Sequence, residues 1–138
     1  MDAATKQLFA EYEKAFNKLE IEKQVPMFAD HFISGGPKGS IAQGREEFMK
    51  LSHQAADFYR SIGQTGARIV SMKETTISDH YSMVTIHWAA TFRKLGDKPV
   101  EFDVSYFVQK TDPANPKIIM FIAHQDEDQA MKELELAS

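Results

Sequence analysis

The spacing at which apolar residues recur changes once along this chain, near Gly63. Before that point, three stretches repeat apolar residues at helical spacing, and after it the alternation is that of three or four strands. Helices gathered first and strands second are typical of an α+β domain, in which a curved antiparallel sheet folds over a few helices. The sequence therefore predicts a concave interior between helices and sheet, and we expect any site to lie there.

The composition is that of one cytoplasmic domain spanning residues 1–138. The chain is long enough to bury a core without stabilising cross-links. Its lack of cysteine excludes disulfides and a thiol nucleophile. A net charge of -4 spread over interspersed acidic and basic residues argues against a nucleic-acid surface. No segment reads as a signal peptide or a membrane span, so we expect no membrane partner.

Three helices are expected in the first half of the chain. The first covers about residues 3–19, and a short second helix carries Phe28 and Phe32. A loop follows at 34–39, where glycines and a proline break the pattern, and the clearest helix begins after Gly44.

Four strands are expected in the second half, followed by a polar tail at 126–138 that is either a short helix or disordered. Their ranges are 67–77, 81–93, 100–110 and 117–124. Alternation in the second strand puts one apolar set on a single face, namely Val84, Ile86, Trp88, Ala90 and Phe92.

Several short runs carry a resemblance that covers nearly the whole chain. They are residues 12–17 (YEKAFN), 27–32 (MFADHF), 37–39 (PKG), 44–48 (GREEF) and 118–126 (IIMFIAHQD). In their order and spacing they resemble the SnoaL-like branch of the nuclear transport factor two-like superfamily. The resemblance implies a cone-shaped α+β barrel with a deep apolar pocket, commonly dimeric through the outer face of the sheet. It does not fix the function, because the fold hosts isomerases, cyclases, dehydratases, hydrolases and noncatalytic binding domains.

The ketosteroid-isomerase-like pattern of that superfamily is only partly present. Tyr12 falls where the resemblance places a tyrosine donor, but the position of the carboxylate base is Gly36 and that of the protonated aspartate is Ser105. Glycine cannot abstract a proton, and serine is a weaker donor than a neutral carboxylic acid. Steroid isomerisation by that route is therefore not expected.

The same alignment turns Asp103, Ser105 and Phe107 toward the pocket, beside Trp88. A carboxylate among these aromatic rings would be desolvated and its pKa raised, which makes Asp103 and Tyr12 a candidate acid-base pair. The opposite strand parity stays open, because a shift of one residue would turn Asp103 to solvent.

Two functional classes follow from these residues. One is a cofactor-independent cyclase, isomerase or dehydratase for an apolar, oxygen-bearing molecule, with Tyr12 and Asp103 as catalytic residues. The other is a noncatalytic ligand-binding or dimerisation domain. In either class the expected lining residues are Phe16, Phe28, Phe48, Trp88, Ser105, Phe107 and Phe121.

A homodimer is expected from the inward placement of Asp103. That parity exposes Phe102, Val104, Tyr106 and Val108 together, and a partner sheet would cover such a patch. His124 and Asp126 share a strand face two residues apart, but without a third ligand they predict no metal site, and their parity turns them outward.

Overall fold

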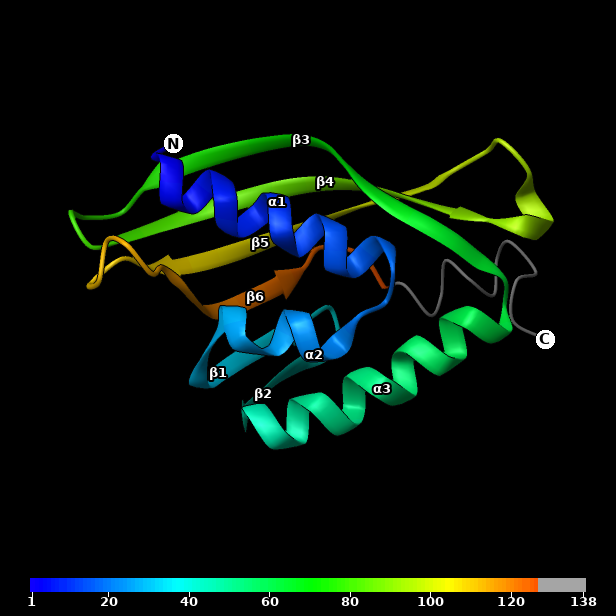
Figure 1. The fold of residues 1–138 in the computed structure, drawn as a ribbon, viewed down its shortest axis with the longest axis horizontal. Coiled ribbons are helices and arrows are strands. Elements are labelled where there is room, and N and C mark those ends of the chain that lie inside the picture. Colours follow the sequence, from blue (N-terminus) through cyan, green and yellow to red (C-terminus); the bar gives the residue numbers. More distant parts are fainter. Residues whose placement is uncertain (127–138) are drawn as a thin grey trace.

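The computed structural model describes residues 1–126 and has the α+β architecture that the sequence predicts (Figure 1). Of the tail expected at 126–138, only Asp126 lies within the described residues. No helix in the described part of the chain is long and apolar enough to cross a bilayer. The helices and strands are α1 (Ala3–Asn17), α2 (Ile21–Gln24), η1 (Val25–Met27), β1 (Phe28–Gly36), β2 (Gly39–Gly44), α3 (Arg45–Ser61), β3 (Gln64–Thr76), β4 (Tyr81–Phe92), η2 (Arg93–Leu95), β5 (Val100–Gln109) and β6 (Lys117–Ala123).

One six-stranded sheet, in the order β2-β1-β6-β5-β4-β3, forms the scaffold. All neighbouring strands are antiparallel except β1 and β6, which run parallel, so the sheet is mixed. It curves around the helices without closing into a barrel, and β2 and β3 remain its edges. Helices α1 and α2 lie over one side of the sheet, and α3 runs along its β1–β2 end (Figure 1).

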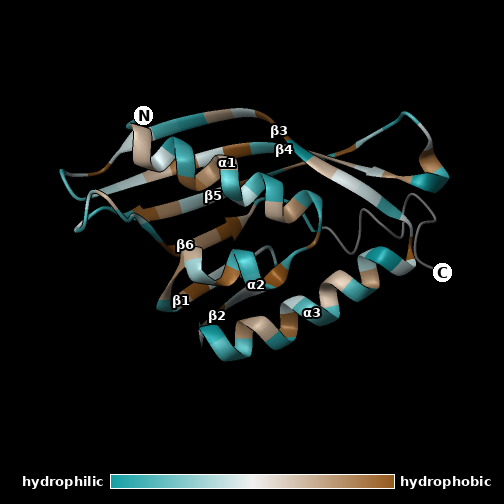
Figure 2. Ribbon diagram, viewed as in Figure 1, coloured by the Kyte–Doolittle hydropathy of each residue, from teal (hydrophilic) through white to brown (hydrophobic). Residues whose placement is uncertain are grey.

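Helix α1 is fixed to the sheet at both ends. The Asp2 carboxylate caps the helix by accepting a hydrogen bond from the Thr5 amide at 2.8 Å. It also accepts one at 2.8 Å from the ammonium of Lys110, which directly follows β5. At the other end, the Asn17 side-chain oxygen accepts from the amide of Ala67 on β3 at 2.9 Å. Brown and teal bands alternate along α1 and α3 in Figure 2, as expected of helices with one face on a core.

The segment predicted as the second helix contains a strand, which corrects the sequence prediction. Phe28 and Phe32 are both buried, but they lie on β1 after the short turns α2 and η1. Their spacing of four residues fits a helix face and also a strand face, so the pattern could not separate the two. The loop predicted at 34–39 is likewise a β-hairpin, in which Gly36 pairs with Gly39.

The faces of β4 agree with prediction, whereas those of β5 are inverted. In the antiparallel register, Trp88 lies opposite Phe102 and Val84 lies opposite Tyr106. Residues directly opposite each other in such a pair share a face, so these four side chains point to the same side. Phe102, Val104, Tyr106 and Val108, predicted to form an exposed patch, are therefore inside, with 7%, 6%, 2% and 0% exposure.

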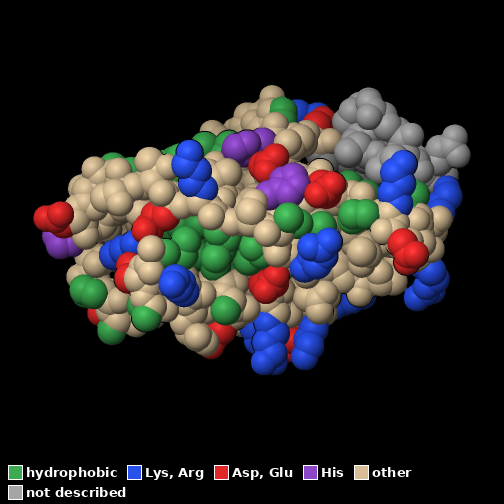
Figure 3. Space-filling model, turned by 90° about the horizontal axis from the view of Figure 1, so that it is seen from above, with side chains coloured by type: hydrophobic (Ala, Val, Ile, Leu, Met, Phe, Trp, Pro, Cys, Tyr) green, Lys and Arg blue, Asp and Glu red, His purple; other side chains and the backbone are tan. Residues whose placement is uncertain are grey.

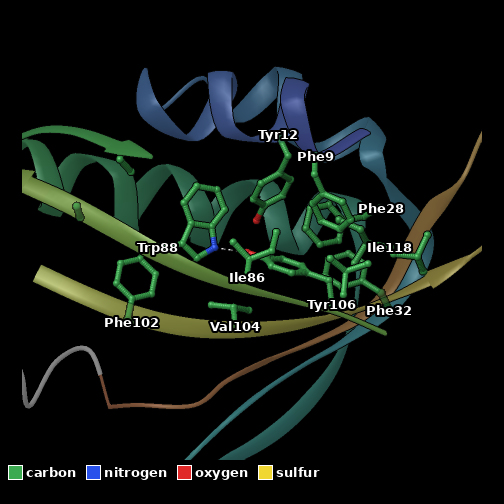
Figure 4. Close-up of a cluster of buried hydrophobic side chains, with 14 of the residues drawn as sticks. Phe9, Tyr12, Phe28, Phe32, Ile86, Trp88, Phe102, Val104, Tyr106 and Ile118 are labelled. Carbon is green, nitrogen blue, oxygen red and sulfur yellow. Dashed lines mark hydrogen bonds between the residues drawn. The ribbon is translucent and has the colours of Figure 1, made fainter. Parts of the chain in front are cut away.

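Aromatic contacts in the core join β4 and β5 to α1. Figure 4 shows Phe102, Val104 and Tyr106 pointing from β5 toward the helices, on the same side as Trp88. The Trp88 indole N–H donates to the Tyr106 hydroxyl at 3.2 Å. Trp88 also stacks on Phe16, with ring centroids 4.9 Å apart. These contacts fix the inner face of the sheet.

Candidate functional site

An interior cavity of about 180 Å³ lies between the helices and the inner face of β5 and β6. Its walls come from α1, both ends of α2, the middle of α3 and the strands β5 and β6. The lining residues are Tyr12, Phe16, Leu19, Ile21, Gln24, Phe48, Ser52, Ala55, Ala56, Tyr59, Phe102, Val104, Tyr106, Phe121 and Ala123.

The polar side chains that line this cavity are of uncharged types. Phenol, hydroxyl and amide groups come from Tyr12, Gln24, Ser52, Tyr59 and Tyr106. Among the described residues, the lining includes no carboxylate, imidazole or ammonium group. The cavity therefore offers shape, aromatic surface and hydrogen bonds, and it lacks a group that ordinarily acts as a general base.

Most of the predicted aromatic residues lie in or directly behind this cavity. Tyr12, Phe16, Phe48 and Phe121 line it. Trp88 and Phe28 lie behind the lining residues and are fully buried. Trp88 supports Phe16, and Phe28 packs on Phe48 at a ring-centroid distance of 4.7 Å.

Sequence reasoning missed several lining residues, for different reasons. Tyr106 was assigned to the wrong face of β5. Gln24 and Ser52 are polar residues on helices, where a polar side chain ordinarily indicates the solvent side. Tyr59 lies on the inner face of α3 and is half-buried, and its spacing of seven residues from Ser52 would have placed it there had Ser52 been recognised.

A second hollow of about 310 Å³, which we call the mouth, adjoins the cavity. The two share Tyr59, Phe121 and Ala123, and the mouth extends to the turn of the β1–β2 hairpin. There the Lys38 ammonium lies 3.3 Å from the Asp126 carboxylate, so one ion pair stands at the entrance.

Asp103, predicted to face the cavity, lies on the outer face of the sheet and does not meet Tyr12. Its carboxylate is 2.7 Å from His87 Nδ1, and the other ring nitrogen of His87 is 3.0 Å from Glu101. The hydrogen bond from His87 lowers the pKa of Asp103, in contrast to the rise expected for an inward carboxylate. The hydrogen bonds that His87 donates to the Asp103 and Glu101 carboxylates raise the pKa of His87.

Ser105 and Phe107 follow the same parity and also lie on the outer face. Ser105 lies opposite Thr85, and its hydroxyl is 2.9 Å from the Thr85 hydroxyl and 2.8 Å from His124 Nε2. Figure 3 shows histidine side chains gathered with acidic ones in the middle of the surface seen from above. His124 is exposed on this face, and no three described His, Asp or Glu side chains are arranged to hold a metal ion.

The outer face carries a different apolar set from the one predicted. Phe107 lies opposite Met120, which in turn lies opposite Ile33, and Ile122 follows on the same face of β6. Ile33 and Ile122 are 41% and 38% exposed. The homodimer stays a prediction, now with these residues as its candidate contacts.

A larger hollow, of about 710 Å³, lies elsewhere, between the β1–β2 edge and the start of α3. Two of its charged residues, Arg45 and Asp30, already bind each other. The Arg45 guanidinium lies 3.2 Å from the Asp30 carboxylate and donates to the Phe28 carbonyl at 3.0 Å. The internal cavity is the better candidate site, because it encloses a ligand on several sides.

A curved mixed sheet with helices on its concave side and an apolar cavity between them defines an NTF2-like protein. Solved structures agree with this class. The chain resembles an NTF2-like protein of unknown function from Shewanella oneidensis with a TM-score of 0.71 and 14% identity, over 88% of this chain and 97% of that one. It also belongs to a specific family, the one described as NTF2-like protein (DUF6841), which it matches over residues 2–126.

Two further structures share the fold. One is an NTF2-like protein of unknown function from Pseudomonas putida, with a TM-score of 0.72, 7% identity and coverage of 88% of this chain and 84% of that one. The other is a ketosteroid isomerase-like protein from Erwinia carotovora, with a TM-score of 0.64, 14% identity and coverage of 88% and 93%. The chain has no match among curated proteins. At these identities the structures establish the fold alone.

Proposed function

We propose that this protein binds a small, mainly apolar ring compound in the cavity behind Tyr59 and Phe121. The observation that carries the proposal is the enclosed aromatic lining with neutral polar groups and no carboxylate or imidazole among its described residues. Such a lining favours a molecule that fills space and accepts a few hydrogen bonds over one that must lose or gain a proton.

The cavity volume limits the ligand to about one ring. An apolar cavity of about 150 Å³ is enough to hold benzene, and the interior here measures about 180 Å³. A substituent on the ring would extend through the shared residues Tyr59, Phe121 and Ala123 into the mouth.

A single tryptophan gives a direct readout of binding. Trp88 is the only tryptophan of the chain and stacks on Phe16, which lines the cavity. Titration with 2-phenylethanol is expected to change its fluorescence in a saturable way. Wild-type protein that shows no saturable change, and no contact with the probe by NMR, would refute the proposal.

A pair of substitutions on α3 provides the matched control. Ser52→Phe places a ring in the cavity and is expected to weaken binding by about tenfold or more, since little space then remains. Gln54→Phe adds the same ring to an exposed position of the same helix and should leave the affinity unchanged. Equal effects of both substitutions would place the probe outside the cavity.

The catalytic alternative, with Tyr12 and Asp103 as an acid-base pair, has less support. Tyr12 does line the cavity, but Asp103 and its histidine partner lie across the sheet from it. If the protein turns over a bound ketone, Tyr12→Phe should slow that reaction and Asp103→Asn should not. Loss of turnover in a folded Asp103→Asn variant would restore the pair.

A further inference from the structure

The two charged side chains at the mouth of the cavity differ in their exposure to solvent. The side chain of Lys38 is 77% exposed, whereas that of its partner Asp126 is only 28% exposed. Apart from the phenol of Tyr59, these two residues carry the ionisable groups among the described residues that line the mouth. A ligand that extends into the mouth therefore comes close to this ion pair.

We propose that the ligand carries a primary ammonium group, which takes the place of Lys38 beside the Asp126 carboxylate. This inference rests on the proposed binding function and specifies the chemical class of the ligand as a small arylalkyl amine. The ring occupies the interior cavity, and the ammonium group lies at the mouth.

The energetic cost of exchanging the partners favours a cation over an anion. Lys38 is mostly in water already, so releasing it loses only a weak surface ion pair and leaves a well-hydrated ammonium. The exchange keeps a positive partner on Asp126. An anionic ligand would instead have to draw Lys38 away and lie beside the Asp126 carboxylate, where like charges repel.

The rings at the entrance add to the preference for a cation. Tyr59 and Phe121 line both the mouth and the interior cavity, so a ligand that passes from one to the other runs along them. The faces of such rings attract an ammonium group placed within about 6 Å of their centres. A carboxylate at the same place would meet the negative face of each ring.

Three probes of similar size and different charge separate these possibilities. They are 2-phenylethylamine, 2-phenylethanol and phenylacetate, each titrated against the full chain with the fluorescence of Trp88 as the readout. The amine is expected to bind about two- to fivefold more tightly than the alcohol, as an ion pair at a partly exposed site allows. Phenylacetate should bind most weakly.

Substitutions at the mouth assign the preference to the proposed contact. Asp126→Asn should reduce the affinity for the amine to that for the alcohol, and Lys38→Gln should raise it, because an internal competitor is removed. Asp112→Asn removes an exposed carboxylate from the β5–β6 turn and controls for net charge.

The possible outcomes separate this inference from the function on which it rests. Equal affinities for amine and alcohol, or a preference that survives in Asp126→Asn, would overturn the ammonium proposal. The binding function would stand in that case, provided that Ser52→Phe still weakens binding of the alcohol. If none of the probes binds the wild-type protein, both proposals fail together.

Discussion

The hydrogen bond between Trp88 and Tyr106 makes the strand assignment of β5 measurable. Both residues are buried, with 0% and 2% exposure, and the indole N–H is 3.2 Å from the phenol oxygen. This contact exists only if Tyr106 faces the helices. A double-mutant cycle of Trp88→Phe and Tyr106→Phe therefore tests the inner face of the sheet directly.

The expected coupling follows from the geometry of the bond. A distance of 3.2 Å lies at the long end of the usual range for N–H donors, so we expect the lower part of the typical contribution, about 0.5 to 1 kcal/mol. Tyr106→Phe alone should cost about 1 to 2 kcal/mol, because it leaves the buried N–H of Trp88 without this acceptor. In the double variant that N–H is gone as well, so the two costs should not add.

Urea unfolding followed by far-ultraviolet circular dichroism measures all four proteins on one scale, which fluorescence cannot do once Trp88 is replaced. Equal denaturant slopes across the set would show that the comparison is between like transitions. Costs that add within about 0.3 kcal/mol would mean that the two side chains do not interact, and the inward placement of Tyr106 would be refuted.

Three other predictions concern single positions. His87→Gln should lower the free energy of unfolding by less than about 1 kcal/mol, because the His87–Asp103 pair is partly exposed. Since the pKa of His87 is raised on folding, this loss should be full below about pH 6 and vanish as pH rises through the folded pKa. A loss that does not change with pH, or the same pH dependence in the exposed His80→Gln, would contradict the ion pair. Gly66→Ala should destabilise the fold by about 1 to 3 kcal/mol in thermal unfolding, because the added Cβ would lie 2.5 Å from the Asn17 side-chain oxygen. An unchanged midpoint temperature of unfolding would show that this oxygen does not hold the end of α1. Sedimentation should show a homodimer that Ile122→Glu dissociates, since Ile122 lies exposed on the outer face; a wild-type monomer at micromolar concentration would exclude it.

The sequence predicts those elements of the fold whose periods are unambiguous. Helix α3 begins after Gly44, and the four strands from β3 to β6 lie within three residues of their predicted bounds. The alternation in β4 is clear because its outward residues from Thr85 to Thr91 are polar or small. The strand β1 was missed because Phe28 and Phe32 satisfy two periods at once, and the six-stranded sheet was accordingly expected to be smaller.

The face of β5 could not be read from its own residues. One set contains Phe102 and Tyr106, whereas the other contains Phe107 as well as Asp103, so each face carries an aromatic residue. The register against β4 decides between them, because Trp88 fixes the side on which Phe102 must lie. Pairing the well-predicted strand with its neighbour would have given the correct parity from the sequence, whereas alignment to a distant family did not.

The inverted parity has a chemical consequence for the pocket. The sheet separates two sets of functional groups: the ionisable side chains of β5 meet His87 on the outer face, and the inner positions that line the cavity are Phe102, Val104 and Tyr106. Under the proposed binding function, selection inside the cavity would rest on volume and hydrogen bonds to uncharged groups. Discrimination by charge would then depend on the mouth, where Lys38 and Asp126 meet, and a ligand with a ring at one end and a charge at the other would use both.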